Sequence, residues 1–218
     1  MTAKGAPVIV KLGGSLAEGE AQRLSSILKI VGAATRPCIV VPGGGAFADA
    51  VRDAYRSHGL TQAVAHRMAL LAMHQTGMML AGMDGRFVCA ETLSMIRRAL
   101  AEDRIPVWMP LKMSADDAHI THDWKTTSDA LAARLAERLG RASVALVKSC
   151  AIDPQATAAA LSRAGVVDAT FPKIIARAKL DWRVLGVGDE DELAQLLGAE
   201  VGAARRTASR RRAIPRKK

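Results

Sequence analysis

Two short apolar runs, each followed by glycines, constrain the fold more than any other feature of this sequence. Val8–Leu12 is followed by Gly13–Ser15, and Ile39–Val41 leads through a proline to Gly43–Gly45. Both runs are typical of buried strands, and Ala21–Ala34 between them carries apolar side chains at helical spacing. A strand, a helix and a strand in this order form a parallel β-α-β unit. The sheet is therefore expected to begin parallel.

Strand and helix patterns alternate through the rest of the chain without an internal repeat. The expected helices are Ala46–His58, Thr61–Ala81, Glu91–Asp103, Ala130–Leu139, Thr157–Ala164, Lys173–Ala178 and Asp189–Leu197, and the expected strands are Ile105–Trp108, Ser143–Val147 and Trp182–Val187. This order predicts a three-layer α/β/α sandwich on a mostly parallel central sheet. In such sheets, ligands bind beyond the carboxyl ends of the strands.

Length and composition indicate one soluble domain. A chain of 218 residues with 50 % hydrophobic residues can bury a large core, which aliphatic side chains must fill because only 3 % are aromatic. Cys38, Cys89 and Cys150 are odd in number and widely spaced, which argues against a disulfide framework or a thiolate zinc site. No apolar run approaches the ~20 residues of a membrane span. We therefore expect a cytoplasmic protein with no membrane partner.

The formal charge of +10 comes mostly from the end of the chain. Residues 205–218 hold eight of the 31 basic residues and no acid, so residues 1–204 carry 23 basic and 21 acidic side chains, a net charge of +2. We expect residues 1–204 to form a single domain and 205–218 a disordered basic tail. The tail has either no specific partner or a loose, salt-sensitive contact with RNA or an acidic surface.

Three common nucleotide-binding patterns are excluded. A Walker A loop places its lysine after the glycines, whereas Lys11 precedes Gly13 and Gly14. A dinucleotide-binding fingerprint needs three spaced glycines after the first strand, and only two are present. The motifs His-Arg-Asp and Asp-Phe-Gly of protein kinases are missing as well.

The residues that remain suit phosphate chemistry. Backbone N–H groups in the two glycine turns can face anions, and Lys11 beside them can bridge donor and acceptor phosphates. Glycines that only turn a strand into a helix are the alternative interpretation. Asp129 lies where a helix begins, so it either caps that helix or orients lysines that converge on the phosphates, with Lys11 and Lys173 as candidates.

These residues, in this order, resemble the amino acid kinase superfamily, which includes acetylglutamate, aspartate and uridylate kinases. Lys11–Ser15 is similar to the loop that holds the transferred phosphate, and Pro42–Gly45 to the acceptor-side loop. Thr127–Asp129, followed by Ala130–Ala132, resembles the segment whose aspartate organises the catalytic lysines. The similarity covers nearly all of residues 7–202 and implies the same α/β/α fold.

A narrower resemblance points to one branch of the superfamily. Gly43–Asp49, Ala65–Ala69 and Trp124, three residues before Thr127, are similar to the branch that contains the aminomethylfuran-methyl phosphate kinase of methanofuran biosynthesis. Members of this branch convert a phosphomonoester into a diphosphate with ATP. Isopentenyl phosphate kinases tend to carry a histidine near the end of the glycine segment, where Asp49 stands here.

The resemblance implies a set of site residues. The implied catalytic residues are Lys11, Asp129 and Lys173; the nucleotide- and phosphate-binding residues are Gly13, Gly14, Ser15, Lys148 and Ser149; and the substrate-binding residues are Gly43, Gly44, Gly45, Phe47, Asp49, His66, Trp124, Thr127 and Ser128. Lys148 stands where many relatives have the aspartate of Leu-Thr-Asp, so it either meets ATP phosphates or is solvated. His119 and His122 are interpreted as surface polar residues rather than metal ligands.

The expected function is ATP-dependent phosphoryl transfer to a small phosphomonoester, with Mg²⁺ carried on the nucleotide. The acceptor favoured by the resemblance is the aminomethylfuran-methyl phosphate of a one-carbon cofactor pathway. The alternatives are another small-molecule kinase, of the acyl phosphate or UMP type, or a non-catalytic relative that binds ligands or acts as a scaffold. The methionine-rich stretch Met68–Met79 makes a homo-oligomer plausible.

Overall fold

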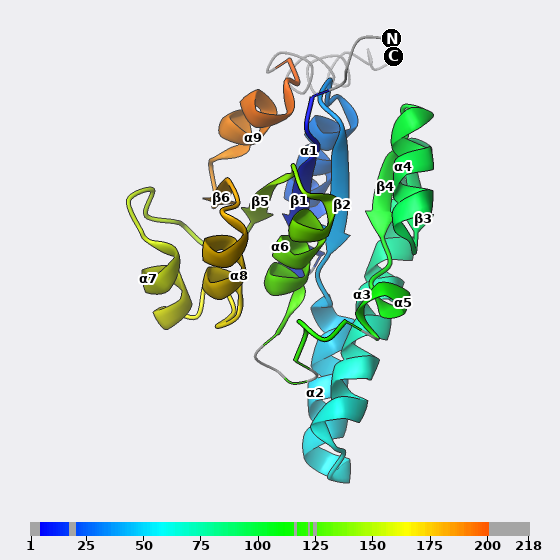
Figure 1. Cartoon of the computed structure of the whole chain (residues 1–218), viewed down its shortest axis with the longest axis vertical. Helices are drawn as coiled ribbons and strands as arrows, with labels where there is room; N and C mark the ends of the chain where they lie inside the picture. The colour runs from blue at the N-terminus through cyan, green and yellow to red at the C-terminus, as the bar shows by residue number, and fades with distance from the viewer. Residues whose placement is uncertain (1–4, 18–20, 116, 122, 124–125, 201–218) are drawn as a thin grey trace, which may run out of the picture.

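A six-stranded sheet forms the centre of the molecule (Figure 1). The computed structural model describes residues 5–17, 21–115, 117–121, 123 and 126–200. The strands are β1 (Val8–Leu12), β2 (Cys38–Pro42), β3 (Phe87–Ala90), β4 (Ile105–Trp108), β5 (Ser143–Val147) and β6 (Trp182–Leu185), in the spatial order β3-β4-β2-β1-β5-β6. Each neighbouring pair is parallel. The predicted parallel sheet is confirmed, and the expected basic tail lies outside the described residues.

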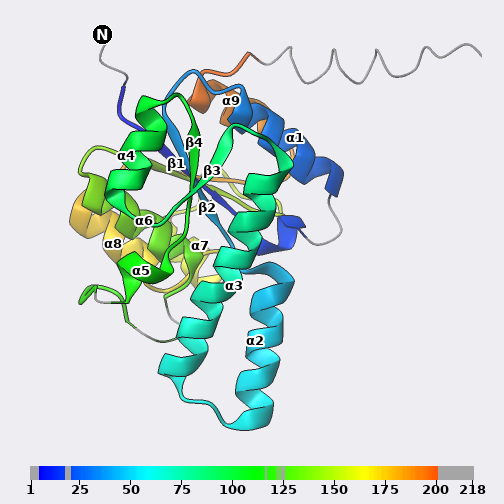
Figure 2. The same cartoon turned by 90° about the vertical axis from the view of Figure 1, so that its right-hand side faces the viewer.

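Helices cover both faces of the sheet, as the sandwich prediction requires (Figures 1 and 2). The helices are α1 (Ala21–Gly32), α2 (Gly45–His58), α3 (Gln62–Met83), α4 (Leu93–Ala101), α5 (Leu111–Ser114), α6 (Ser128–Leu139), α7 (Ala158–Arg163), α8 (Phe171–Ala178) and α9 (Glu190–Leu197). Val8, Val10 and Leu12 pack with α1 and α9 on one face, whereas Ile9 packs with α6 and α8 on the other. Lys11 shares this second face because side chains alternate along a strand.

Helices α2 and α3 project as a hairpin beyond the carboxyl ends of the strands (Figure 2). The two helices contact each other through a small apolar cluster of their own, which includes Ala48, Val51 and Ala65. Although α3 runs for 22 residues, neither it nor any other helix in the described ranges is long and apolar enough to cross a bilayer. The hairpin therefore forms a side wall beyond the carboxyl ends of the strands, where ligands bind in parallel sheets.

The short helix α5 was not predicted, α8 begins at Phe171 rather than Lys173, and two further local features differ from the sequence prediction. Strand β3 was not expected, because four residues at a sheet edge give too short an apolar pattern to recognise. The helix expected to begin at Glu91 begins at Leu93 instead, because the Thr92 hydroxyl accepts a hydrogen bond from the Met95 amide and caps it there.

The two glycine loops touch each other through their backbones. A Cβ atom on Gly43 would overlap the backbone nitrogen of Gly14, and one on Gly14 would overlap that of Gly45. Gly43 also donates its N–H to the Leu12 carbonyl at 2.8 Å, which fixes the loop on β1. These glycines are therefore required by the close approach of the two loops and not only by the turns themselves.

We predict that Gly43→Ala lowers the free energy of unfolding by about 1–3 kcal/mol, because the added methyl group overlaps backbone rather than a side chain that can move. Gly82→Ala is the matched control: this position lies inside α3 with nothing near the added carbon. We expect the control to gain up to about 1 kcal/mol from helix propensity. Urea unfolding measures both changes, and an unchanged midpoint for Gly43→Ala would contradict the packing described.

Candidate active site

The carboxyl ends of the neighbouring strands β2, β1 and β5 open into a cavity of about 710 Å³. Helices α2 and α3 form one wall, the first turn of α6 lies at the centre, and residues 162–169 form the opposite wall. This is the end of a parallel sheet where ligands are expected. The cavity brings together these predicted site residues: Lys11, Gly14, Ser15, Gly44, Gly45, Asp49, His66, Thr127, Ser128, Asp129 and Lys148.

A carboxylate between two lysines forms the centre of the cavity. The Lys11 Nζ lies 2.9 Å from Asp129 Oδ1, and the Lys148 Nζ donates a hydrogen bond of 2.7 Å to Asp129 Oδ2. The Asp129 residue is 3 % exposed and Lys11 is 5 % exposed. Two ammonium groups therefore meet at the ends of β1 and β5, and each has further N–H donors that can bind a phosphate.

The strand register places the two lysines on the same face of the sheet, two residues apart along the strand direction. Lys11 is paired with Leu146 in the β1–β5 ladder, and Lys148 directly follows β5. The backbone of Lys148 is held from two sides: its N–H donates to the Leu185 carbonyl at 2.8 Å, and its own carbonyl accepts from Arg23 of α1 at 2.9 Å. Arg23 also reaches the Gly186 carbonyl at 2.6 Å. The ends of β5 and β6 are thereby locked around Lys148.

Burial and charge act together on the ionisation of these groups. Burial alone would raise the pKa of Asp129, but the charges of Lys11 and Lys148 outweigh it and hold this pKa below the usual value. Burial, assisted by the like charge of Lys11, lowers the pKa of Lys148 to about 8, although Asp129 opposes the shift. Asp129 is therefore ionised at neutral pH, and Lys148 loses its proton in the mildly alkaline range.

The structure excludes one of the two interpretations of Asp129 and one of the two of Lys148. Asp129 does not cap α6, because the N-cap position is Thr127 and both Asp129 oxygens face lysines. The interpretation of Lys148 as a solvated lysine is wrong, since its side chain is 12 % exposed and bound to Asp129. The expected convergence of Lys173 on Asp129 is not seen: Lys173 is exposed on α8 and does not line the cavity.

Asp168 belongs to this site and was missed by the sequence analysis. It lines the cavity and lies in the segment before α8. Burial and the neighbouring Asp129 raise the pKa of Asp168, whereas hydrogen bonds from Ala130, Thr127 and Phe171 oppose the rise. An aspartate shortly before an expected helix was the available signal, but a single acid in that position is too common to be recognised as part of a site.

The remaining predicted residues that the structure describes do not line the cavity. Gly13 donates its N–H to the Val147 carbonyl at 3.0 Å, and Gly43 donates its N–H to the Leu12 carbonyl. Both glycines therefore fix the loops through backbone hydrogen bonds. The Ser149 hydroxyl lies 2.7 Å from that of Ser15 and ties the end of β5 to the first loop. Phe47 is 43 % exposed on α2 and lies outside the lining. Trp124 lies outside the described residues.

On the α2 wall, a pair of opposite charges faces the cavity. Asp49 and Arg52 are ion-paired one turn apart, and the buried His66 of α3 lines the cavity with them. Within the described ranges, no three His, Cys, Asp or Glu side chains are grouped as metal ligands would be. His119 is exposed, and its backbone N–H donates to Asp117 at 3.0 Å; His122 lies outside the described residues.

We predict that Asp129→Asn lowers the free energy of unfolding by about 3 kcal/mol, because Lys11 and Lys148 remain buried without their carboxylate. Asp53→Asn removes the same charge from an exposed ion pair with Arg56, and we expect a change within about 0.5 kcal/mol. Chemical denaturation at pH 7 measures both variants. Equal stability of the two variants would contradict a buried ionic cluster.

Comparison with known proteins gives independent evidence about the family and the fold of this chain. Over 123 residues the chain is 28 % identical to the [5-(aminomethyl)furan-3-yl]methyl phosphate kinase of Methanocaldococcus jannaschii, an alignment that covers 56 % of each protein. The chain thus matches just over half the length of this curated relative.

Solved structures share the fold at low sequence identity. The uridylate kinase of Archaeoglobus fulgidus has a TM-score of 0.64 and 19 % identity, covering 88 % of this chain and 95 % of that one. The UMP kinase of Bacillus anthracis has a TM-score of 0.62 and 14 % identity, covering 88 % and 91 %. The sequence profile of the amino acid kinase family matches residues 6–152, two thirds of the chain. The chain therefore belongs to the amino acid kinase family.

Proposed function

We propose that this protein is an ATP-dependent small-molecule kinase that transfers the γ-phosphoryl group to a phosphomonoester and forms a diphosphate. The observation that carries the proposal is the buried group Lys11–Asp129–Lys148 at the point where two glycine loops meet. Phosphoryl transfer asks a protein mainly for positioning and charge neutralisation, and this group offers both.

Individual residues of the chain have separate roles in such a transfer. An oxygen of the acceptor phosphate attacks the γ-phosphorus, the bond from that phosphorus to its bridging oxygen breaks, and ADP leaves with the bridging electron pair. Lys11 and Lys148 neutralise the charge that the two anions bring together, while Asp129 fixes both ammonium groups. We propose that Mg²⁺ enters with the nucleotide. An acceptor phosphate is already an anionic nucleophile, so the reaction needs no strong general base.

We further propose that the acceptor is [5-(aminomethyl)furan-3-yl]methyl phosphate, the compound in the name of the M. jannaschii relative. This molecule carries an ammonium group at one end and a phosphate at the other. The Asp49–Arg52 pair on the α2 wall offers one charge of each sign to such an acceptor. The compound would place the reaction in the biosynthesis of a methanofuran-type one-carbon cofactor.

A panel of acceptors tests this proposal directly. The purified protein is incubated with Mg²⁺ and ATP, together with the aminomethylfuran phosphate, UMP, isopentenyl phosphate, acetylglutamate or aspartate, and ADP release is measured. We expect release with the furan phosphate and little with the carboxylates. If UMP is the best acceptor, the proposed furan phosphate acceptor is wrong and UMP takes its place. If no ADP is released and calorimetry detects no ATP binding, a non-catalytic scaffold is favoured.

We predict that Lys11→Ala and Lys148→Ala each lower kcat about 100-fold or more, because each removes a charge aimed at the phosphates. Lys173→Ala is the matched control for the exposed lysine of α8, and we expect a much smaller effect on kcat. Steady-state kinetics with saturating ATP compares the three variants. A large loss in Lys173→Ala beside a small one in Lys148→Ala would make Lys173 the second catalytic lysine.

We also propose that the protein forms a homo-oligomer through the outer face of α3. Large apolar side chains are exposed along this helix: Val64, Leu71, Met78, Met79 and Met83. Exposed apolar surface of this extent on one helix is typical of an interface.

We predict that Met78→Glu lowers the oligomeric mass measured by light scattering, because Met78 is 63 % exposed and would place a charge in the interface. Val187→Glu, at a 54 % exposed apolar site between β6 and α9, should leave the mass unchanged. A monomeric wild-type protein would contradict the proposed interface. So would an oligomeric mass that is the same in Met78→Glu as in the wild type. The cytoplasmic location inferred from the sequence stays a prediction.

A further inference from the structure

One buried carboxylate joins the starts of two helices beside the lysines. Asp168 Oδ2 accepts hydrogen bonds from the Thr127 N–H at 3.0 Å, the Thr127 hydroxyl at 2.8 Å and the Ala130 N–H at 2.9 Å. Its Oδ1 accepts from the N–H groups of Thr170 at 3.0 Å and Phe171 at 2.8 Å. Neither α6 nor α8 has a side-chain cap from its own N-cap residue. Asp168 therefore supplies the cap for both helices.

This double cap fixes the residue that holds the lysines. Asp129 lies between Thr127, the N-cap residue, and Ala130 in the first turn of α6, and Asp168 binds the amides of both. The α6 backbone on either side of Asp129 is therefore tied to the start of α8, which is itself anchored by the buried Phe171. Movement of this tie would move the Asp129 carboxylate relative to Lys11 and Lys148.

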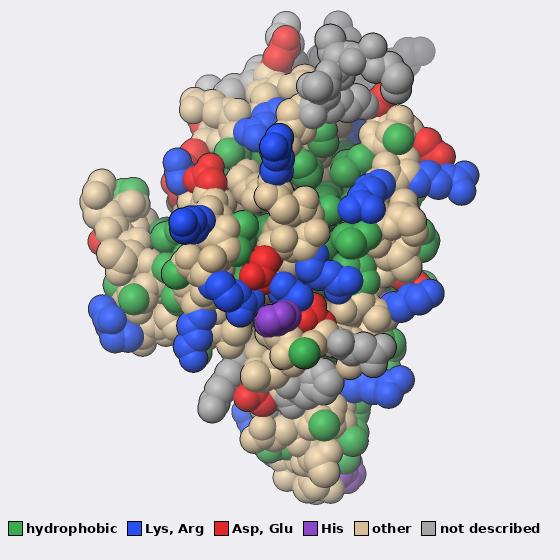
Figure 3. All heavy atoms as spheres, viewed as in Figure 1, with side chains coloured by type: hydrophobic (Ala, Val, Ile, Leu, Met, Phe, Trp, Pro, Cys, Tyr) green, Lys and Arg blue, Asp and Glu red, His purple; other side chains and the backbone are tan. Residues whose placement is uncertain are grey.

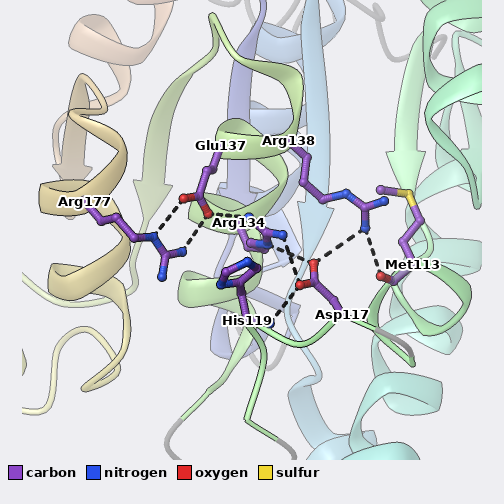
Figure 4. Close-up of polar contacts among 7 residues, drawn as sticks. All are labelled: Met113, Asp117, His119, Arg134, Glu137, Arg138 and Arg177. Carbon is purple, nitrogen blue, oxygen red and sulfur yellow. Dashed lines mark hydrogen bonds and ion pairs between the residues drawn. The ribbon is translucent and has the colours of Figure 1, made fainter.

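A second tie joins the same two helices away from the cavity (Figure 4). Glu137 of α6 accepts two hydrogen bonds from Arg177 of α8, at 2.9 and 2.7 Å, and one from Arg134 at 2.6 Å. Arg134 also binds Asp117 with two hydrogen bonds. Figure 3 shows basic and acidic side chains gathered on this face of the molecule. The network holds α6 to α8 but includes none of the three central residues, so it provides a control for purely structural coupling.

Charge links Asp168 to Lys148 as well. The charged groups that act on the Lys148 ammonium are Lys11 on β1, Asp129 on α6 and Asp168 before α8. Lys11 disfavours the protonated form, whereas Asp129 and Asp168 favour it. Asp129 is shared with Lys11, and Asp168 adds a second carboxylate that favours the Lys148 ammonium.

We propose that Asp168 is a positioning residue for phosphoryl transfer: by capping the starts of both α6 and α8 it fixes Asp129 between the two lysines, and its carboxylate favours the charged form of Lys148. The catalytic part of this inference rests on the proposed kinase function, but the electrostatic part does not. Asp168 need not touch either substrate, because it acts through Asp129 and Lys148.

The test is the titration of the Lys148 side chain by NMR in the full-length protein without substrates, assigned by its loss in Lys148→Arg. In Asp168→Asn we expect the pKa of Lys148 to fall by roughly half a unit to one unit, as the loss of a nearby opposite charge produces. Glu137→Gln is the matched control: it removes one carboxylate charge and weakens the α6–α8 contact, and we expect no shift. An unshifted Lys148 in Asp168→Asn would overturn the proposal.

A second variant keeps the charge and changes the geometry. In Asp168→Glu, Lys148 should titrate as in the wild type, while kcat falls because the longer side chain cannot make the same five hydrogen bonds. A fall in the Lys148 pKa equal to that in the asparagine variant would attribute the shift to displaced packing and overturn the electrostatic part of the proposal. If the wild type transfers no phosphoryl group but the Asp168→Asn shift is present, the proposed function fails and the electrostatic role of Asp168 stands.

Discussion

The burial of one carboxylate between two lysines is the interaction on which the functional end of this molecule depends. Removing charges from water costs free energy that only close, well-directed partners offset. Asp129 meets this condition with Lys11 at 2.9 Å and Lys148 at 2.7 Å. The parallel neighbours β1 and β5 deliver both lysines to the same edge, and α6 delivers the carboxylate. Each ammonium group keeps N–H donors beyond those that face Asp129, and these donors can bind an anion.

Backbone contact between the glycine loops defines the other side of this site. Side chains at Gly14 or Gly43 would separate the loops, so the absence of a Cβ atom at both positions sets how closely they approach. Lys11 lies between these loops and the start of α6. A phosphate bound here would face backbone N–H groups and an ammonium group together, a combination suited to holding it in a fixed orientation.

The alternating sequence pattern was sufficient to predict the parallel sheet, because β-branched runs such as Val8–Leu12 are buried on both faces and show little ambiguity. It also placed Lys11, the glycines and Asp129 at one edge. The pattern could not show that Lys148 rather than Lys173 reaches Asp129, since this depends on side-chain direction at the end of β5. Nor could it reveal Asp168, whose five hydrogen bonds come from four residues at the starts of two helices that meet only in the folded chain.

The pH dependence of kcat/KM in the wild type and in Lys148→Arg tests the central claim most directly. The account predicts that wild-type activity declines as the pH rises through about 8, where Lys148 loses its proton in the free enzyme. An arginine keeps its charge over this range, so the decline should disappear from the variant while measurable phosphoryl transfer remains. The same decline near pH 8 in Lys148→Arg would contradict the claim that the charge of Lys148 drives the reaction.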